Sequence, residues 1–86
     1  FVHAGVDPSL RLEQQGDTFW WGHRDFIAME KHFEGFRRIF AGHSPYKDGF
    51  QQYQQVTVLD GGSGYGGQLL GARIDPNGHV LELLED

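Results

Sequence analysis

Near the carboxyl end of the chain, residues 68–84 read QLLGARIDPNGHVLELL, and this stretch carries the clearest structural signal in the sequence. Two strand-like runs, 68–74 and 79–84, flank the tetrapeptide Asp75-Pro76-Asn77-Gly78. An Asn-Gly pair supplies the positive φ angles that a tight hairpin turn needs. The stretch therefore predicts a β-hairpin.

Two further strands are predicted upstream of this hairpin. The β-branched run Val56-Thr57-Val58-Leu59 predicts a strand, and residues 37–41 predict a short buried strand that ends at the turn Gly42-His43-Ser44-Pro45. Phe1-Val2 is typical of the end of another buried strand. The polar run between the strands at 37–41 and 56–59, residues 46–55, contains four Gln and predicts an exposed connection.

One helix is predicted across residues 19–34. Asp17 or Thr18 can cap its first turn, and Gly35 can end it. Apolar residues recur through this range at helical spacing: Phe26, Ile27, Met29, Phe33 and Phe36. Trp20 and Trp21 are expected to cover the core. Strands predominate, with one main helix and a C-terminal hairpin, so the expected fold class is α+β.

Length and composition limit the remaining possibilities. The 86 residues suffice for one segment, 1–86, and for no second domain. No cysteine is present, which excludes disulfides and thiolate metal sites, so a metal would need His or carboxylate ligands. The net charge of −5 argues against nucleic acid and anionic membranes as partners. No apolar run is long enough to span a membrane.

The five histidines differ in their positions along the chain. His23, His32 and His79 have no ligand partner at a recognised spacing, so we expect structural roles for them. His3 and His43 each follow a short apolar strand beside glycine, where α/β folds place ligands. Two imidazoles are too few for a metal site, which would also need Asp7, Asp60 or residues outside this chain.

A glycine-dense loop, residues 62–67, matches the G-x-G-x-x-G pattern of dinucleotide-binding turns. That motif must open a helix, which would begin near Gly67. The residues after it predict a strand instead. A tight loop between strands is the favoured interpretation.

Several short motifs in order resemble the carboxyl half of the calcineurin-like metallophosphoesterases, most closely the bacterial serine/threonine protein phosphatases. The motifs are Phe1-Val2-His3-Ala4-Gly5, Trp21 with Arg24-Asp25-Phe26, Ile39-Phe40-Ala41-Gly42-His43-Ser44-Pro45, Val58-Leu59-Asp60 and Tyr65-Gly66-Gly67. The resemblance implies the carboxyl half of a four-layer β-sandwich flanked by helices. Two motifs depart from the usual pattern of the family. Trp21-Gly22-His23-Arg24 is one residue longer than the family's Trp-x-Arg motif, and Ser44 stands where the family more commonly has Thr after Gly-His.

By this resemblance, the parent protein is a hydrolase that cleaves phosphate esters with a hydroxide activated by two divalent metal ions, Mn, Fe or Zn. His3 and His43 would bind one of these metals, and Arg24 and Tyr65 would contact substrate. The family's Gly-Asp-x-His, Gly-Asp-x-x-Asp-Arg and Gly-Asn-His-Glu motifs do not occur here. We therefore expect a fragment without catalytic residues of its own that is inactive in isolation.

Substrate and setting follow from the same resemblance. The substrate is expected to be a phosphoprotein. If the parent is a symmetrical diadenosine tetraphosphatase, the substrate would instead be a dinucleoside polyphosphate. The expected location is the bacterial cytoplasm. The alternative from another class is a non-catalytic structural or binding fragment whose histidines only form hydrogen bonds. Exposed sheet edges would favour self-association of such a fragment.

Overall fold

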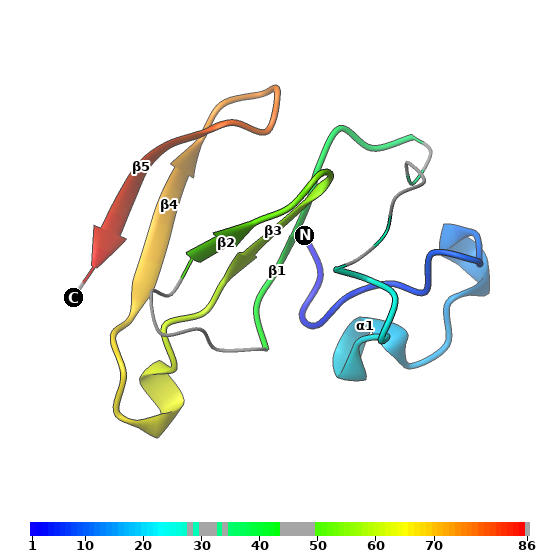
Figure 1. Cartoon of the computed structure of the whole chain (residues 1–86), viewed down its shortest axis with the longest axis horizontal. Helices are drawn as coiled ribbons and strands as arrows, with labels where there is room; N and C mark the ends of the chain where they lie inside the picture. Colours follow the sequence, from blue (N-terminus) through cyan, green and yellow to red (C-terminus); the bar gives the residue numbers. More distant parts are fainter. Residues whose placement is uncertain (28, 30–32, 34, 44–49, 86) are drawn as a thin grey trace.

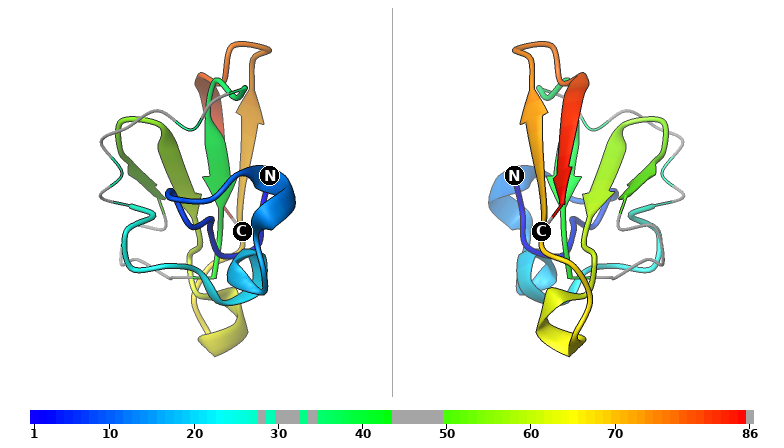
Figure 2. Two further views of the ribbon diagram at one scale, coloured as in Figure 1. Left: turned by 90° about the vertical axis from the view of Figure 1, so that its right-hand side faces the viewer. Right: turned by 90° about the vertical axis from the view of Figure 1, so that its left-hand side faces the viewer.

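The computed structural model describes residues 1–27, 29, 33, 35–43 and 50–85. It shows a small α+β protein built mainly of strands in two sheets. The N-terminal segment, with η1 (Leu12–Gln14) and α1 (Thr18–Trp21), lies on one side of a three-stranded sheet, and a hairpin lies on the other (Figures 1 and 2). No helix of this described part has the length and apolar character needed to cross a membrane.

The three-stranded sheet has the order β1-β3-β2. β1 (Ile39–Ala41) pairs in parallel with β3 (Val56–Leu59), and β2 (Phe50–Gln52) pairs with β3 in the antiparallel direction. The strands predicted at 37–41 and 56–59 are therefore confirmed. Because β1 and β3 are parallel, their carboxyl ends meet at one edge of the sheet.

The hydrophobic core lies between this sheet and the N-terminal segment. Alternate residues of a strand point to the same face, so Ile39 and Ala41 of β1 share a face with Val56 and Val58 of β3. Four buried side chains from outside the sheet complete the cluster: Val6, Phe26, Met29 and Phe33. The apolar periodicity of residues 19–34 thus identified residues that are buried.

The helix predicted over residues 19–34 is wrong in its extent. Asp17 occupies the N-cap position of α1, but its side chain does not form the expected capping hydrogen bond, and α1 ends after four residues at Gly22. Gly22 has φ 84° and ψ −175°, a conformation open essentially to glycine alone, and it turns the chain away from the helical path. Phe26, Met29 and Phe33, which follow in the sequence, are buried in the core. Trp20 and Trp21, expected to cover the core, are 64% and 72% exposed.

Two other predictions need correction. Phe1-Val2 is not a strand: the Val2 N–H donates to the carbonyl of Phe40 in β1, while Phe1 is exposed and stacks on the Phe40 ring. The polar run 46–55 is not simply an exposed connection, because its residues 50–52 form β2 and Gln55 is buried. The rest of that prediction, residues 46–49, lies outside the described residues, as does the role assigned to His32.

The C-terminal hairpin is confirmed. β4 (Leu70–Ile74) pairs with β5 (Val80–Glu85) in the antiparallel direction, with a bulge between Arg73 and Ile74. The turn differs from the expected one, because Gly78 at φ 88° has a positive φ and Asn77 does not. The Asp75 carboxylate completes the turn by accepting hydrogen bonds from the N–H groups of Asn77 and His79, both at 2.9 Å.

This turn predicts a local pH dependence. The hydrogen bond from the His79 N–H, with those from Asn77 and the His79 ring, holds the pKa of Asp75 below its ordinary 3.8. A carboxyl with a lowered pKa in the folded state stabilises the fold above its unfolded pKa and loses that contribution as pH falls through the folded pKa. Below about pH 4 we therefore expect the turn to loosen, with the Asn77 and His79 amide signals in NMR spectra following the Asp75 titration.

An Asp75→Asn variant provides the control for this experiment. The amide oxygen can still accept both backbone hydrogen bonds but cannot titrate, so the acid transition of the turn should disappear. An Asp75 carboxyl that titrates at or above 3.8 in the folded chain would contradict the role assigned to these hydrogen bonds.

Candidate functional site

The candidate site forms where the carboxyl ends of β1 and β3 meet. His43 follows β1 after Gly42, and Asp60 follows β3 directly. The N-terminal segment reaches the same edge, because the Gly42 N–H donates to the His3 carbonyl at 2.9 Å. The Gly42 Cβ position lies 3.4 Å from the Leu59 carbonyl oxygen, so the two strand ends are in contact there.

The structure brings His3 and His43 together although 40 positions separate them in the chain. His3 Nε2 lies 3.2 Å from His43 Nδ1. The ring centroids are 5.0 Å apart, and the rings meet edge to face. This proximity arises from the fold alone, since His3 enters from the N-terminal segment and His43 from the end of β1.

The separation of the two nitrogens fits a shared metal ion. Imidazole nitrogens bind zinc at about 2.0–2.1 Å, so two of them on one tetrahedral ion would lie roughly 3.3 Å apart. The same distance also fits an N–H···N hydrogen bond between two neutral rings. Within the part of the chain that the structure describes, no group of three or more His, Asp or Glu side chains is placed to hold a metal ion. The pair could therefore supply two ligands of a larger site.

His43 has a left-handed backbone conformation, with φ 69°, and is the one described residue other than glycine with a positive φ. This conformation is uncommon outside glycine and costs roughly 1–2 kcal/mol. Strained backbone of this kind tends to persist where the side chain has a function. The conformation contributes to placing the His43 ring beside His3.

The two carboxylates that sequence analysis considered as further ligands lie in different places. Asp60 is at the site: its Oδ1 accepts a hydrogen bond from the Gly62 N–H at 2.8 Å, and its Oδ2 lies 3.8 Å from the position of a Cβ on Gly42. Asp7 is engaged elsewhere, where it accepts hydrogen bonds from the N–H and the hydroxyl of Ser9. Asp60 is therefore the carboxylate beside Gly42, the residue that precedes His43.

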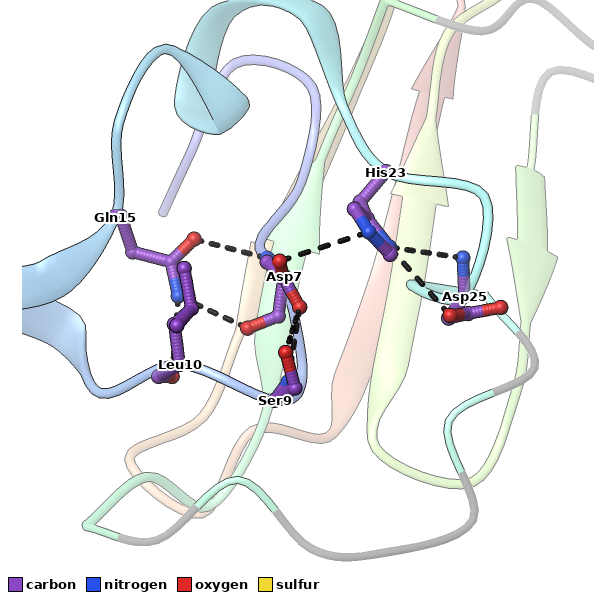
Figure 3. Close-up of polar contacts among 6 residues, drawn as sticks. All are labelled: Asp7, Ser9, Leu10, Gln15, His23 and Asp25. Carbon is purple, nitrogen blue, oxygen red and sulfur yellow. Dashed lines mark hydrogen bonds and ion pairs between the residues drawn. The ribbon is translucent and has the colours of Figure 1, made fainter.

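Asp7 belongs to a polar cluster that joins two loops (Figure 3). The His23 ring lies between two carboxylates, with Nε2 3.6 Å from Asp7 Oδ2 and Nδ1 3.8 Å from Asp25 Oδ2. The side chain of Gln15 closes the Asp7 loop through its hydrogen bonds to the Asp7 N–H and carbonyl. The hydroxyl and N–H of Ser9, together with the nearby His23, hold the pKa of Asp7 below its ordinary value.

In this cluster His23 contacts carboxylates from two segments. Each ring nitrogen faces a carboxylate, so the imidazole links the N-terminal loop to the turn that follows α1. His79 has a comparable local partner, because its Nδ1 lies 3.2 Å from Asp75 Oδ2 in the hairpin turn. Sequence reasoning missed the pairing of Asp7 with His23, since loop closure creates it and no sequence spacing marks it.

The two predicted substrate contacts have different surroundings. Arg24 is exposed and lines a cavity of about 220 Å³ together with His43, so the structure places it close to the histidine pair. Tyr65 is 91% exposed in η2 (Ser63–Tyr65) and lines neither this cavity nor a larger apolar one of about 410 Å³ beside Phe19 and Ile39.

The glycine-dense loop does not open a helix. Gly62 and Gly66 take left-handed conformations around η2, Gly62 forms a bridge with Gln68, and β4 begins at Leu70. A Cβ on Gly67 would overlap the Gly61 carbonyl oxygen, so the packing of this loop requires glycine there. The dinucleotide-binding interpretation is therefore wrong, and the tight loop between strands is confirmed.

Gly22, which lies within Trp21-Gly22-His23-Arg24, ends α1 with a positive φ of 84°. A Cβ there would meet Ala4 only at an ordinary 3.6 Å, so the cost of a side chain comes from the backbone conformation. We expect Gly22→Ala to lower the free energy of unfolding by about 1–3 kcal/mol in urea denaturation. Gly16→Ala is the control, because Gly16 has no atom within 4 Å of its Cβ position and no positive φ. Equal effects of the two substitutions would contradict this account.

Comparisons of the chain with family models, with curated proteins and with solved structures found no match.

Proposed function

We propose that this chain is the carboxyl half of a metal-dependent phosphoesterase similar to the bacterial serine/threonine protein phosphatases. The observation that carries the proposal is the 3.2 Å approach of His3 Nε2 to His43 Nδ1 at the carboxyl edge of two parallel strands. Both residues belong to the motifs that resemble the family. In the proposed site they supply two nitrogen ligands to one of two divalent metals.

The remaining roles follow from the positions of the side chains. Arg24, on the cavity wall beside His43, would pair with a phosphate oxygen of the substrate through its guanidinium group. Asp60 holds the loop after β3 through the Gly62 N–H and keeps one oxygen near Gly42. When bound, the two metals would activate water and neutralise the charge that develops on phosphorus. The other metal ligands and the catalytic groups would come from the other half of the fold, a four-layer β-sandwich.

Zinc binding tests the proposal directly. We expect Zn²⁺ to shift the ring nitrogen signals of His3 and His43 together in NMR spectra of the full 86-residue chain. Replacing either ligand should weaken zinc binding by about tenfold or more, since a site with few ligands depends on each of them. His79→Ala is the matched control, because its single carboxylate partner lies in the hairpin turn. Zinc shifts spread evenly over His23 and His79, with none at His3 and His43, would refute the proposal.

The substitution at His43 can be made in two forms. His43→Ala removes the ring and keeps a side chain at φ 69°, whereas His43→Gly removes the ring and relieves the backbone. Both should lose zinc, and the glycine variant should be more stable than the alanine variant by about 1 kcal/mol. A zinc loss restricted to the less stable variant would indicate unfolding instead of ligand removal. Adding Mn²⁺ to the wild-type chain should produce no phosphomonoester hydrolysis, because the remaining ligands are missing.

One observation favours a second candidate, a non-catalytic fragment in which the histidines form a hydrogen bond. The described residues place no third ligand with the pair. In that case each His→Ala change would lower stability and leave zinc binding unchanged, so the same variants separate the two candidates.

A further inference from the structure

The turn that joins β4 to β5 contains the one asparagine of the chain, Asn77, directly before Gly78 (Figure 1). Asn77 is exposed. Because glycine has no Cβ, the backbone nitrogen of Gly78 can be approached closely by the Asn77 side chain. The turn therefore presents to water a side-chain amide that can react with the next backbone nitrogen.

This reaction is deamidation, and it needs only hydroxide and water. Hydroxide removes the proton from the Gly78 nitrogen, which then attacks Asn77 Cγ. A C–N bond forms, the bond from Cγ to the amide nitrogen breaks, and ammonia leaves with a proton from water, so that a five-membered succinimide ring remains. Water opens the ring at the side-chain carbonyl to give a normal aspartyl residue, or at the main-chain carbonyl to give an isoaspartyl residue. Both products carry a carboxylate in place of the amide.

The hydrogen bonds of the turn oppose the first step. The Gly78 N–H donates to the Asp75 carbonyl at 3.0 Å, so the attacking nitrogen is engaged. The N–H groups of Asn77 and His79 both donate to Asp75 Oδ1 at 2.9 Å, which fixes the backbone on both sides of the reacting pair. Formation of the ring requires the backbone of Asn77 to rotate and the Gly78 N–H to be released. The turn must therefore open before Asn77 reacts.

The turn also packs against the residues that lead into β1. Arg37 Nη1 donates to the Pro76 carbonyl at 2.9 Å, and a Cβ on Gly78 would lie 3.0 Å from Arg38 Cβ. An isoaspartyl residue adds one atom to the backbone, which this close packing does not accommodate. The normal aspartyl product adds none, and Asp-Gly is favoured in the same tight turns as Asn-Gly.

We propose that Asn77 is a hydrolytic modification site controlled by the hairpin turn. The closed turn preserves the amide, opening of the turn permits deamidation, and the isoaspartyl product prevents the turn from closing again. The modification thus makes an opening of the hairpin irreversible. Because the turn contacts Arg37 and Arg38, this opening weakens the attachment of the hairpin to the sheet that carries the candidate site.

Peptide mapping by mass spectrometry measures the reaction, because exchange of an amide for a carboxylate changes the mass of the peptide that contains Asn77. In mildly alkaline buffer, the full 86-residue chain should lose this amide about tenfold more slowly than the same chain in concentrated urea. Equal rates in the two conditions would overturn the control by the turn. An amide that persists in urea would overturn the assignment of the site.

Substitutions at Asp75 test the control by the turn. Asp75→Ala removes the acceptor of two backbone hydrogen bonds, so the rate in buffer should rise by about tenfold while the rate in urea stays the same. Asp75→Asn keeps an acceptor oxygen and should remain slow, and its new asparagine precedes Pro76, which has no N–H to react. Asp17→Ala is the matched control, because the exposed Asp17 side chain forms no capping bond. If Asp75→Ala reacts as slowly as the parent in buffer, the proposed control by the turn is wrong.

The two products should differ in their effect on the hairpin. Hydrogen exchange of the His79 amide reports the closed turn, since this N–H donates to Asp75. Asn77→Asp reproduces the normal product and should keep the protection of the parent chain. The isoaspartyl chain, separated by chromatography, should exchange this amide roughly tenfold faster. Equal protection in these two chains would show that the modification does not hold the turn open.

Discussion

Gln55→Met should destabilise the chain by about 3–5 kcal/mol, because the substitution leaves several buried backbone groups without partners. The Gln55 side chain is 5% exposed. Its Oε1 accepts a hydrogen bond from the Phe33 N–H at 2.7 Å, and its Nε2 donates to the carbonyls of Phe33 and Phe36 at 3.0 and 2.9 Å. Methionine is similar in size but can form none of these bonds.

The physical reason for the size of this effect is the cost of an unpaired buried polar group, about 1–3 kcal/mol each. Gln55 precedes β3, so it attaches the chain around Phe33 to the sheet that carries the site. A domain of this size is expected to have a total stability of only about 4–13 kcal/mol. The Gln55→Met substitution should therefore remove a large part of the total stability of the chain.

Urea denaturation followed by circular dichroism measures this effect. Gln54→Met is the matched control, because Gln54 is the exposed neighbour and the substitution is the same. Gln55→Glu should also be destabilising, since a carboxylate cannot donate to the two carbonyls. A loss below about 1 kcal/mol in Gln55→Met would mean that water replaces these bonds at little cost.

Phe26→Ala is expected to have a comparable effect, about 3–5 kcal/mol, through the cavity left by a large core side chain. Phe26 is 3% exposed and belongs to the main hydrophobic cluster. It also supports the site, because its ring packs directly against the backbone of Gly5, two residues after His3. A Cβ on Gly5 would lie 2.7 Å from Phe26 Cδ2, closer than real contacts allow.

This contact makes Phe26 and Gly5 suitable for a double-mutant cycle. Gly5→Ala alone should cost about 1–3 kcal/mol by overpacking against the ring. In the double variant the added methyl group enters space that the ring has left, so the combined loss should be smaller than the sum by about 1 kcal/mol or more. Phe1→Ala is the control for aromatic removal, because Phe1 is 93% exposed. Strict additivity of the two changes would refute the contact.

Local sequence patterns were sufficient for four of the five strands and for several core residues, but they missed β2 and wrongly placed a strand at Phe1-Val2. The hairpin 68–84 and the strands around Ile39 and Val56 were predictable, because β-branched runs and turn residues act over a few neighbours. The apolar spacing of Phe26, Met29 and Phe33 marked buried residues. The same spacing did not predict the backbone conformation of these residues correctly. A side chain can be buried against the sheet from a helix or from an irregular segment, so burial alone does not require a helix.

The proximity of His3 and His43 was expected from family resemblance, and the tertiary structure alone shows the rings side by side. A distance between residues so far apart in the chain depends on strand pairing and loop closure, which no local pattern records. The same holds for Asp7 with His23, and for the cavity shared by Trp21 and Arg24. The sequence by itself determined β1, β3 and the C-terminal hairpin, because the preferences of β-branched runs and turn residues are local. Only the tertiary structure decided which side chains meet, because those contacts arise when distant segments pack together.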